Sequence, residues 1–215
     1  MDRRIALKNM GLAFGYTVAT PTLIGLMQSC QDEKSLNWTP SFFTKDQALA
    51  LTQLVDIILP KTDTPSASEV NVDVFIDRFA NEVMDEETQG FMLMAFDVFN
   101  NNALTSSGKE EVADLSTEDL EAALAKALKV STEEQKLNDE IIEKYIEAKK
   151  KGENIDLNEN IANSAFATNL RNMTIWAYKT SEYIGEEVLA YLPVPGEYIP
   201  CGDLEELTGG KAWSI

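Results

Sequence analysis

Residues Thr44–Pro60 read TKDQALALTQLVDIILP and contain both the start and the stop of a helix. Thr44 and Gln47 have the spacing of a capping box, which satisfies free backbone N–H groups at a helix start. Pro60 ends the pattern, because proline cannot continue a helix. The apolar residues between these signals recur at helical spacing, at Leu51, Leu54, Val55, Ile58 and Leu59.

The sequence beyond Pro60 also favours helices, and strand-like alternation is scarce. A loop at residues 60–69 is followed by helical patterns at 72–83, 89–101, 116–129, 132–152 and 157–178, with a polar loop at 100–108. Ser116 and Asp119 form a second predicted capping pair. The chain is therefore expected to be all-α, with one irregular bundle of about five or six helices at residues 44–190.

Apolar residues within these patterns identify the expected core. One helical face carries Val72, Phe75, Ile76, Phe79 and Val83, and Phe91, Met94 and Phe99 are interpreted as core residues instead of a cofactor pocket. The richest apolar run lies in residues 157–178 and contains Ile161, Phe166, Leu170, Met173, Ile175 and Trp176. This segment is predicted to be the central helix of the core.

Residues 191–215 differ in character and predict an extended, Pro/Gly-rich C-terminal tail without regular structure. Three prolines exclude a continuous helix, and aromatic residues are spread between polar ones. The tail is either a strap that seals the core with its aromatic rings or a segment whose rings anchor a partner. The candidates for partner contact are Tyr191, Pro195, Tyr198 and Trp213.

Residues 1–30 have the layout of an export signal, with basic residues before an uncharged run from Met10 to Ser29. Glycine, threonine and proline dilute this run, so a permanent transmembrane helix is the weaker interpretation, since spanning needs about 20 predominantly apolar residues. The stretch DRRIALK resembles the twin-arginine consensus, with Ala6 where phenylalanine is usual. The matching residues are Arg3, Arg4, Leu7 and Lys8.

The stretch LMQSC resembles a bacterial lipobox, in which the cysteine is lipidated and becomes the mature N-terminus. A lipidated Cys30 would anchor the exported protein to a membrane on the periplasmic side, and residues 31–43 would form a linker. The alternatives are an ordinary secretory n-region for the two arginines and, for Cys30, a chance cysteine before a conventional cleavage site.

Charge and missing residue types exclude several functions. The net charge of −18 becomes −20 once three positive and one negative residue of the signal are removed, which excludes nucleic acid as a partner. The chain has no histidine, so serine/histidine and cysteine/histidine mechanisms are excluded. With only Cys30 and Cys201, it also has no cysteine-based zinc site.

No catalytic, cofactor-binding or metal-binding residue is therefore expected in this chain. It has no glycine-rich phosphate-binding fingerprint. Adjacent acidic pairs could in principle serve a glycosidase, but neighbouring helical residues do not face each other, so solvated surface is the better interpretation. These pairs are Glu86 with Glu87, Glu110 with Glu111 and Glu205 with Glu206.

Three segments resemble the gluconate 2-dehydrogenase subunit 3 family, the small gamma-type subunit of membrane-associated flavin dehydrogenases. They are NWTPSFFTKDQALALTQLVDIILPKTDTPSASEVNVDVFID at 37–77, GEEVLAYLPVPGEY at 185–198 and CGDLEELTGGKAW at 201–213. The most specific pieces are ILPKTDTP, Ile58–Pro65, and VPGEY, Val194–Tyr198. Ser66 stands where the family often has glycine, and residues 109–152 are less characteristic.

The resemblance implies a non-catalytic accessory subunit. Its implied partner is a glucose/methanol/choline-type flavoprotein that holds FAD and oxidises a sugar or sugar acid, sometimes with a cytochrome c subunit. The twin-arginine translocase carries folded cargo, so one signal could export the whole complex. Two alternatives are a stand-alone exported helical lipoprotein that binds a sugar or envelope component, and an acid-dependent hydrolase with two convergent carboxylates.

Overall fold

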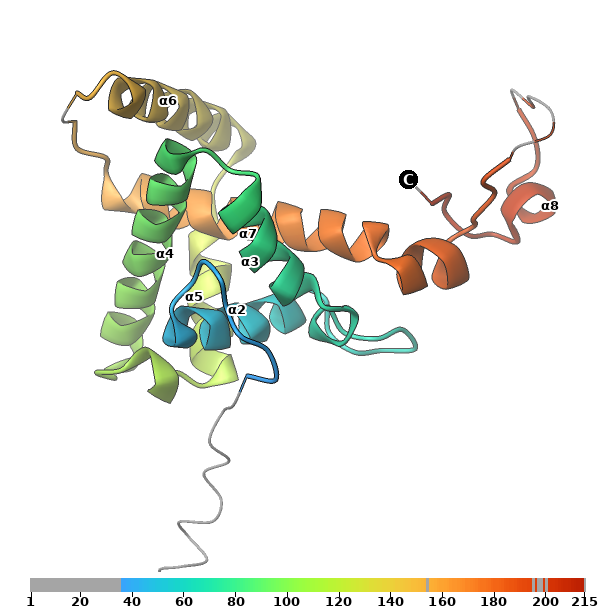
Figure 1. Cartoon of the computed structure of the whole chain (residues 1–215), viewed down its shortest axis with the longest axis horizontal. Coiled ribbons are helices and arrows are strands. Elements are labelled where there is room, and N and C mark those ends of the chain that lie inside the picture. Colours follow the sequence, from blue (N-terminus) through green and yellow to red (C-terminus); the bar gives the residue numbers. More distant parts are fainter. Residues whose placement is uncertain (1–35, 154, 195, 197–198, 200, 215) are drawn as a thin grey trace, which may run out of the picture. The chain divides into compact units, whose positions relative to one another are not determined.

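The computed structural model describes residues 36–153, 155–194, 196, 199 and 201–214. In this part of the chain the structure is helical and has no strand, which confirms the all-α prediction (Figure 1). The helices are α2 (Lys45–Ile58), α3 (Val72–Glu82), α4 (Glu86–Ser107), α5 (Thr117–Ala127), α6 (Thr132–Lys150), α7 (Glu159–Thr180) and α8 (Leu204–Thr208). The predicted export-signal residues Arg3, Arg4, Leu7 and Lys8 and the predicted lipidation site Cys30 lie outside the described residues.

Both predicted capping pairs are present. The Thr44 hydroxyl accepts from the N–H of Gln47, and the Gln47 side chain accepts from the N–H of Thr44, at 3.2 and 3.1 Å. Ser116 and Asp119 form the same reciprocal arrangement at the start of α5. These local interactions set where the helices begin, so the sequence alone locates them.

The predicted loop at residues 100–108 is wrong, because α4 continues to Ser107. Although this segment is polar in sequence, one of its faces points into the protein, and Asn100 and Ala103 on that face are buried. Gly108 then ends the helix with φ of 70°, a left-handed conformation that glycine adopts without strain. Packing of the inward face extends the helix past the point where hydrophobicity drops.

The core forms where α4 packs on α7. Phe96 and Phe166 stack with ring centroids 4.3 Å apart, and Phe99 lies 5.0 Å from Phe166. Phe43, which precedes α2, packs edge-on against Phe96. Since α7 contacts all of α2 to α6, it is the central helix, as predicted.

The apolar faces of α3 and α7 are only partly buried. On α3, Val72 and Ile76 are fully buried, whereas Phe75 and Val83, the residue that follows the helix, are exposed. On α7, Ile175 and Trp176 are also exposed, although their neighbours Thr174 and Ala177 are buried. The expectation that the whole α7 run is core is therefore wrong at these two positions.

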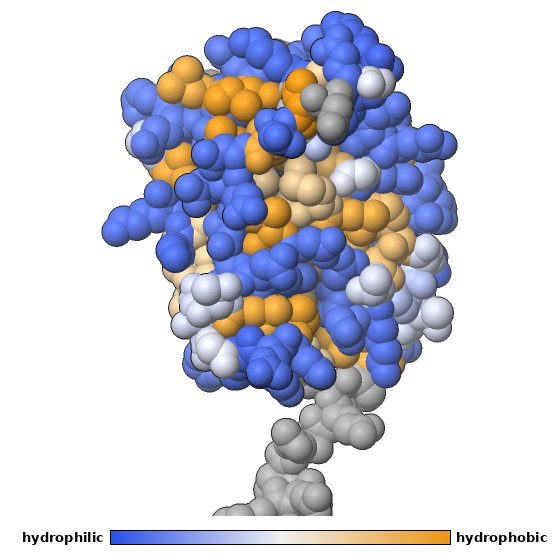
Figure 2. Space-filling view, turned by 90° about the vertical axis from the view of Figure 1, so that its left-hand side faces the viewer, coloured by the Kyte–Doolittle hydropathy of each residue, from blue (hydrophilic) through white to orange (hydrophobic). Residues whose placement is uncertain are grey.

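Helix α6 lies at the surface and buries only Ala148 among its residues. Its C-terminal end is tied to the start of α4 by an ion pair of 2.7 Å between Lys150 Nζ and Asp85 Oδ2. Figure 2 shows a face of the molecule on which hydrophilic residues surround separate hydrophobic patches. A largely hydrophilic surface agrees with the net charge of −18.

Asp119, the acidic member of the capping box at the start of α5, is expected to make a pH-dependent contribution to stability. The Lys109 ammonium, 2.6 Å away, and then the Ser116 N–H and hydroxyl lower the pKa of Asp119 to about 2, from an ordinary value of 3.8. Because the folded pKa lies below the unfolded one, the carboxylate stabilises the fold above about pH 4, and this contribution is lost as the pH falls toward about 2.

We therefore expect Asp119→Asn to lower the free energy of unfolding at neutral pH, with a difference from the wild type that shrinks as the pH falls from about 4 to about 2. Urea unfolding across this pH range measures the difference. Asp63→Asn, on the exposed loop after α2, is the matched control and should show no such trend. A difference for Asp119→Asn that stays constant with pH would contradict the assignment.

Candidate partner-binding surface

Asp77 fixes the segment that leads into α2. Its buried carboxylate accepts hydrogen bonds from three successive backbone N–H groups, of Ser41 at 2.7 Å and of Phe42 and Phe43 at 3.0 Å. A buried carboxylate needs such donors to offset the loss of water. Part of the predicted linker at residues 31–43 is therefore held against α3.

Asp73, one turn earlier on α3, makes a second connection. Its Oδ2 atom accepts from the indole N–H of Trp38 at 3.1 Å and from the hydroxyl of Thr52 on α2 at 2.7 Å. Sequence analysis missed both aspartates, because their partners lie far away along the chain. Their oxygens are occupied by structural donors, so this pair has no free carboxylate for chemistry.

The loop Ile58–Pro65, which is the most specific segment of the resemblance, is also fixed by side chains. The Tyr178 hydroxyl on α7 donates to the carbonyl oxygen of Pro65 at 2.7 Å. The Asp56 carboxylate on α2, just before the loop, accepts hydrogen bonds from the N–H and the hydroxyl of Ser68, just after the loop, at 2.8 and 2.7 Å. The loop therefore connects α2 to α7 and positions the start of α3.

The helices positioned in this way present three aromatic rings together, which we call the aromatic patch: Phe75, Phe79 and Trp176. Ring centroids lie 5.3 Å apart for Phe75 and Trp176, and 5.7 Å apart for Phe79 and Trp176. Phe75 is 38% exposed and Trp176 is 43% exposed. Exposed aromatic residues in contact with one another are typical of protein–protein interfaces.

The chain after α7 forms what we call the C-terminal arm, residues 189–214. Ala190 pairs in parallel with Trp213, through the Ala190 N–H to Ala212 O at 2.8 Å and the Ser214 N–H to Ala190 O at 2.9 Å. The expected tail without regular structure is therefore wrong in part, because it also contains α8. Asp203 caps this helix, and Gly209 ends it with φ of 63°.

The arm exposes its apolar side chains. Its exposed large apolar residues are Tyr191, Leu192, Val194, Ile199, Leu204, Leu207 and Trp213. None of the described arm residues packs against the hydrophobic core. The arm therefore does not act as a strap over the core in the part that the structure describes. Pro195 and Tyr198, the other candidates for partner contact, lie outside the described residues.

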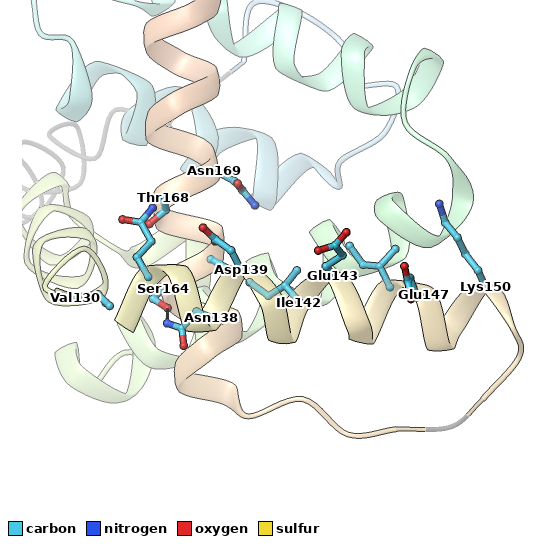
Figure 3. Close-up of a pocket in the computed structure, with 13 residues that line it drawn as sticks. Val130, Asn138, Asp139, Ile142, Glu143, Glu147, Lys150, Ser164, Thr168 and Asn169 are labelled. Atoms are coloured by element: carbon cyan, nitrogen blue, oxygen red, sulfur yellow. Dashed lines mark hydrogen bonds between the residues drawn. The ribbon is translucent and has the colours of Figure 1, made fainter. Parts of the chain in front are cut away.

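A cavity of about 450 Å³ lies between α6 and α7 (Figure 3). Asp139, Glu143 and Glu147 line it from successive turns of α6, and Asn138 donates a long hydrogen bond of 3.4 Å to Ser164 on α7. These groups provide hydrogen-bond acceptors but no nucleophile paired with a base. No aromatic ring lines the cavity to stack on a sugar.

The acidic pairs considered for a glycosidase do not converge. Glu86 and Glu87 lie in the first turn of α4, Glu110 and Glu111 in the connection to α5, and Glu205 and Glu206 in α8. Among the residues that the structure describes, no group of histidine, cysteine or acidic side chains is arranged to hold a metal ion. None of the helices described here is both long enough and apolar enough to cross a membrane.

The fold and these surfaces define a small helical protein with exposed apolar contact surfaces. The sequence model of gluconate 2-dehydrogenase subunit 3 matches residues 45–196, from the start of α2 into the arm. The chain belongs to this family, and the family is that of a subunit of a dehydrogenase complex. No match to the chain is found among the curated proteins or among the solved structures.

Proposed function

We propose that this chain is the non-catalytic accessory subunit of an exported, flavin-dependent sugar or sugar-acid dehydrogenase. The observation that carries the proposal is the C-terminal arm, which holds its apolar side chains away from the core of its own bundle. Water contact with so many large apolar groups is unfavourable, and a partner surface would remove it. Membership of a dehydrogenase-subunit family supports the same conclusion.

In this proposal the catalytic partner is a glucose/methanol/choline-type flavoprotein that holds FAD, and in some complexes of this type a cytochrome c subunit receives the electrons. The accessory chain binds no cofactor itself. It assists folding of the flavoprotein and holds the complex together through the arm. This division of labour agrees with the absence of histidine from the sequence, which deprives the chain of the usual proton shuttle at neutral pH.

The proposal assigns export to the twin-arginine translocase, which would recognise Arg3, Arg4, Leu7 and Lys8. This route transports folded proteins, so a single signal can carry a flavoprotein that has already bound its cofactor. Lipidation of Cys30 would then hold the complex at the membrane on the periplasmic side. The support for both steps is the residue pattern of the sequence.

Replacing Arg3 and Arg4 with lysines tests the shared export. We expect the co-expressed flavoprotein, if it lacks its own signal, to remain in the cytoplasm together with the variant chain. Cell fractionation followed by flavin absorption near about 450 nm measures the location of the partner. A matched Lys34→Arg variant, beyond the predicted signal, should leave export unchanged.

Two outcomes would contradict the proposal. If the flavoprotein reaches the periplasm with the lysine variant, this chain does not supply its export signal. If the isolated chain retains a flavin absorption spectrum after separation from the larger polypeptide, the assignment of the cofactor to the partner is wrong.

A further inference from the structure

A groove of about 500 Å³ separates α3 from the end of α7. Phe75 and Phe79 of the aromatic patch line one side together with Val83, and Thr180 and Glu182 line the other. A second hollow of about 420 Å³ shares Val70, Asn71, Ser181 and Glu182 with it. We call the two together the α3–α7 groove.

The two ends of the α3–α7 groove differ in chemistry. One end is largely apolar, with Phe75, Phe79 and Val83, which is 64% exposed, and it is also lined by Arg78 and Glu82. The other end is acidic and is lined by the carboxylates of Glu69, Glu182, Glu186 and Glu187. An occupant that matches both ends must combine a bulky apolar side chain with positive charges.

Carboxylates outnumber cations at the acidic end. Glu69 forms an ion pair of 2.5 Å with Lys61. Among the described residues, no lysine or arginine forms an ion pair with Glu182, Glu186 or Glu187. Lys211 also lies at this end, where its Nζ donates to the backbone carbonyl oxygen of Glu187 at 3.4 Å. The four carboxylates still outnumber these two ammonium groups, so an added cation is attracted to this end of the groove.

We propose that the α3–α7 groove receives a segment of the catalytic partner chain in which a bulky apolar side chain is followed by lysine or arginine residues. This inference rests on the proposed function and adds a second contact, separate from the arm. The apolar side chain covers the aromatic patch, and the basic residues lie against the glutamates. Charge complementarity makes the partner chain the occupant, because a second copy of this acidic chain, with a net charge of −18, would be repelled.

Photo-crosslinking in the intact complex tests the identity of the occupant. A photoreactive amino acid is placed at Trp176, at Glu186, at Leu204 of the arm, or at Leu137 of α6 as the control. We expect positions 176 and 186 to crosslink to one peptide of the copurifying larger polypeptide, with lysine or arginine in its sequence, and position 137 to give no such product.

Every other outcome would contradict either the proposed occupant of the groove or the accessory-subunit proposal. Crosslinks from positions 176 and 186 to a second copy, or to residues 1–35 of this chain, would replace the proposed occupant. Crosslinks from position 204 alone would remove the groove from the interface and leave the accessory-subunit proposal intact. A chain that purifies without any larger polypeptide and gives no crosslink would overturn both proposals.

Charge reversal measures the acidic end without disturbing the core, because Glu186 and Glu187 are exposed. We expect the double variant Glu186→Lys, Glu187→Lys to bind the copurified polypeptide about 10-fold more weakly at low ionic strength, with a smaller difference at high ionic strength. The control, Glu133→Lys with Glu140→Lys on α6, changes the net charge equally and should stay within about two-fold. Equal losses for the two pairs would show that only net charge matters and would overturn the groove assignment.

Discussion

Replacing Leu204 and Trp213 with serine is expected to weaken binding of the partner about 100-fold while leaving the melting temperature of the isolated chain unchanged. Both side chains are exposed, at 59% and 47%, so their removal opens no cavity in the bundle. At an interface, however, a few buried residues, with tryptophan and tyrosine prominent among them, carry most of the binding free energy, so Trp213 is expected to account for most of the loss. This variant should therefore lose affinity for the partner without losing thermal stability.

Surface plasmon resonance with the immobilised flavoprotein measures the affinity, and circular dichroism measures the melting temperature. The matched control is Leu137→Ser with Ile141→Ser, which removes exposed apolar surface of similar kind from α6. The control should bind like the wild type. Equal loss of affinity in both variants would contradict a specific role for the arm.

Replacing Asp77 with alanine is expected to lower the free energy of unfolding by about 3 kcal/mol. The substitution removes the acceptor for three backbone N–H groups, of Ser41, Phe42 and Phe43, and at least the last of these is buried. A buried donor without a partner costs about 1–3 kcal/mol, because it has lost its water as well. The segment before α2 would detach from α3 to recover that hydration.

Urea unfolding of the variant measures this effect. The variant Asp77→Asn keeps the shape of the side chain but removes its charge. Its amide retains one acceptor oxygen and turns an NH₂ group toward the backbone donors, so this variant should also be less stable than the wild type. Asp63→Ala, on the exposed loop after α2, is the control and should change the free energy of unfolding by less than about 0.5 kcal/mol. A stability of Asp77→Ala equal to that of the control would show that the three hydrogen bonds contribute nothing.

The sequence predicted those parts of the fold that depend on neighbouring residues. The capping boxes at Thr44 and Ser116 act over three residues, so their helix starts could be located without the structure. The end of α4 could not, because burial of Asn100 and Ala103 depends on what packs against them. Helix α8 was missed for a different reason. The prolines before it dominate the composition of the tail, although Asp203 caps a short helix among the residues that follow.

The candidate surface was less predictable than the fold. Phe75 and Ile76 are adjacent and similarly apolar, yet Ile76 is fully buried and Phe75 is exposed. Hydrophobic spacing assigns both to one helical face and cannot state how much of that face the core covers. Asp73 and Asp77 resemble solvated charges in the sequence, because their donors at residues 38–43 become neighbours only after folding.

Pairing of Ala190 with Trp213 closes the C-terminal arm at its base, so the two ends of this long loop are already held together before any partner arrives. Much of the conformational entropy that a free tail would lose on association is therefore lost during folding of this chain alone. Deleting the last residues should therefore lower both the association rate and the affinity for the partner, even where these residues do not contact it. Without the pairing at its base, the arm would have to become ordered each time it binds.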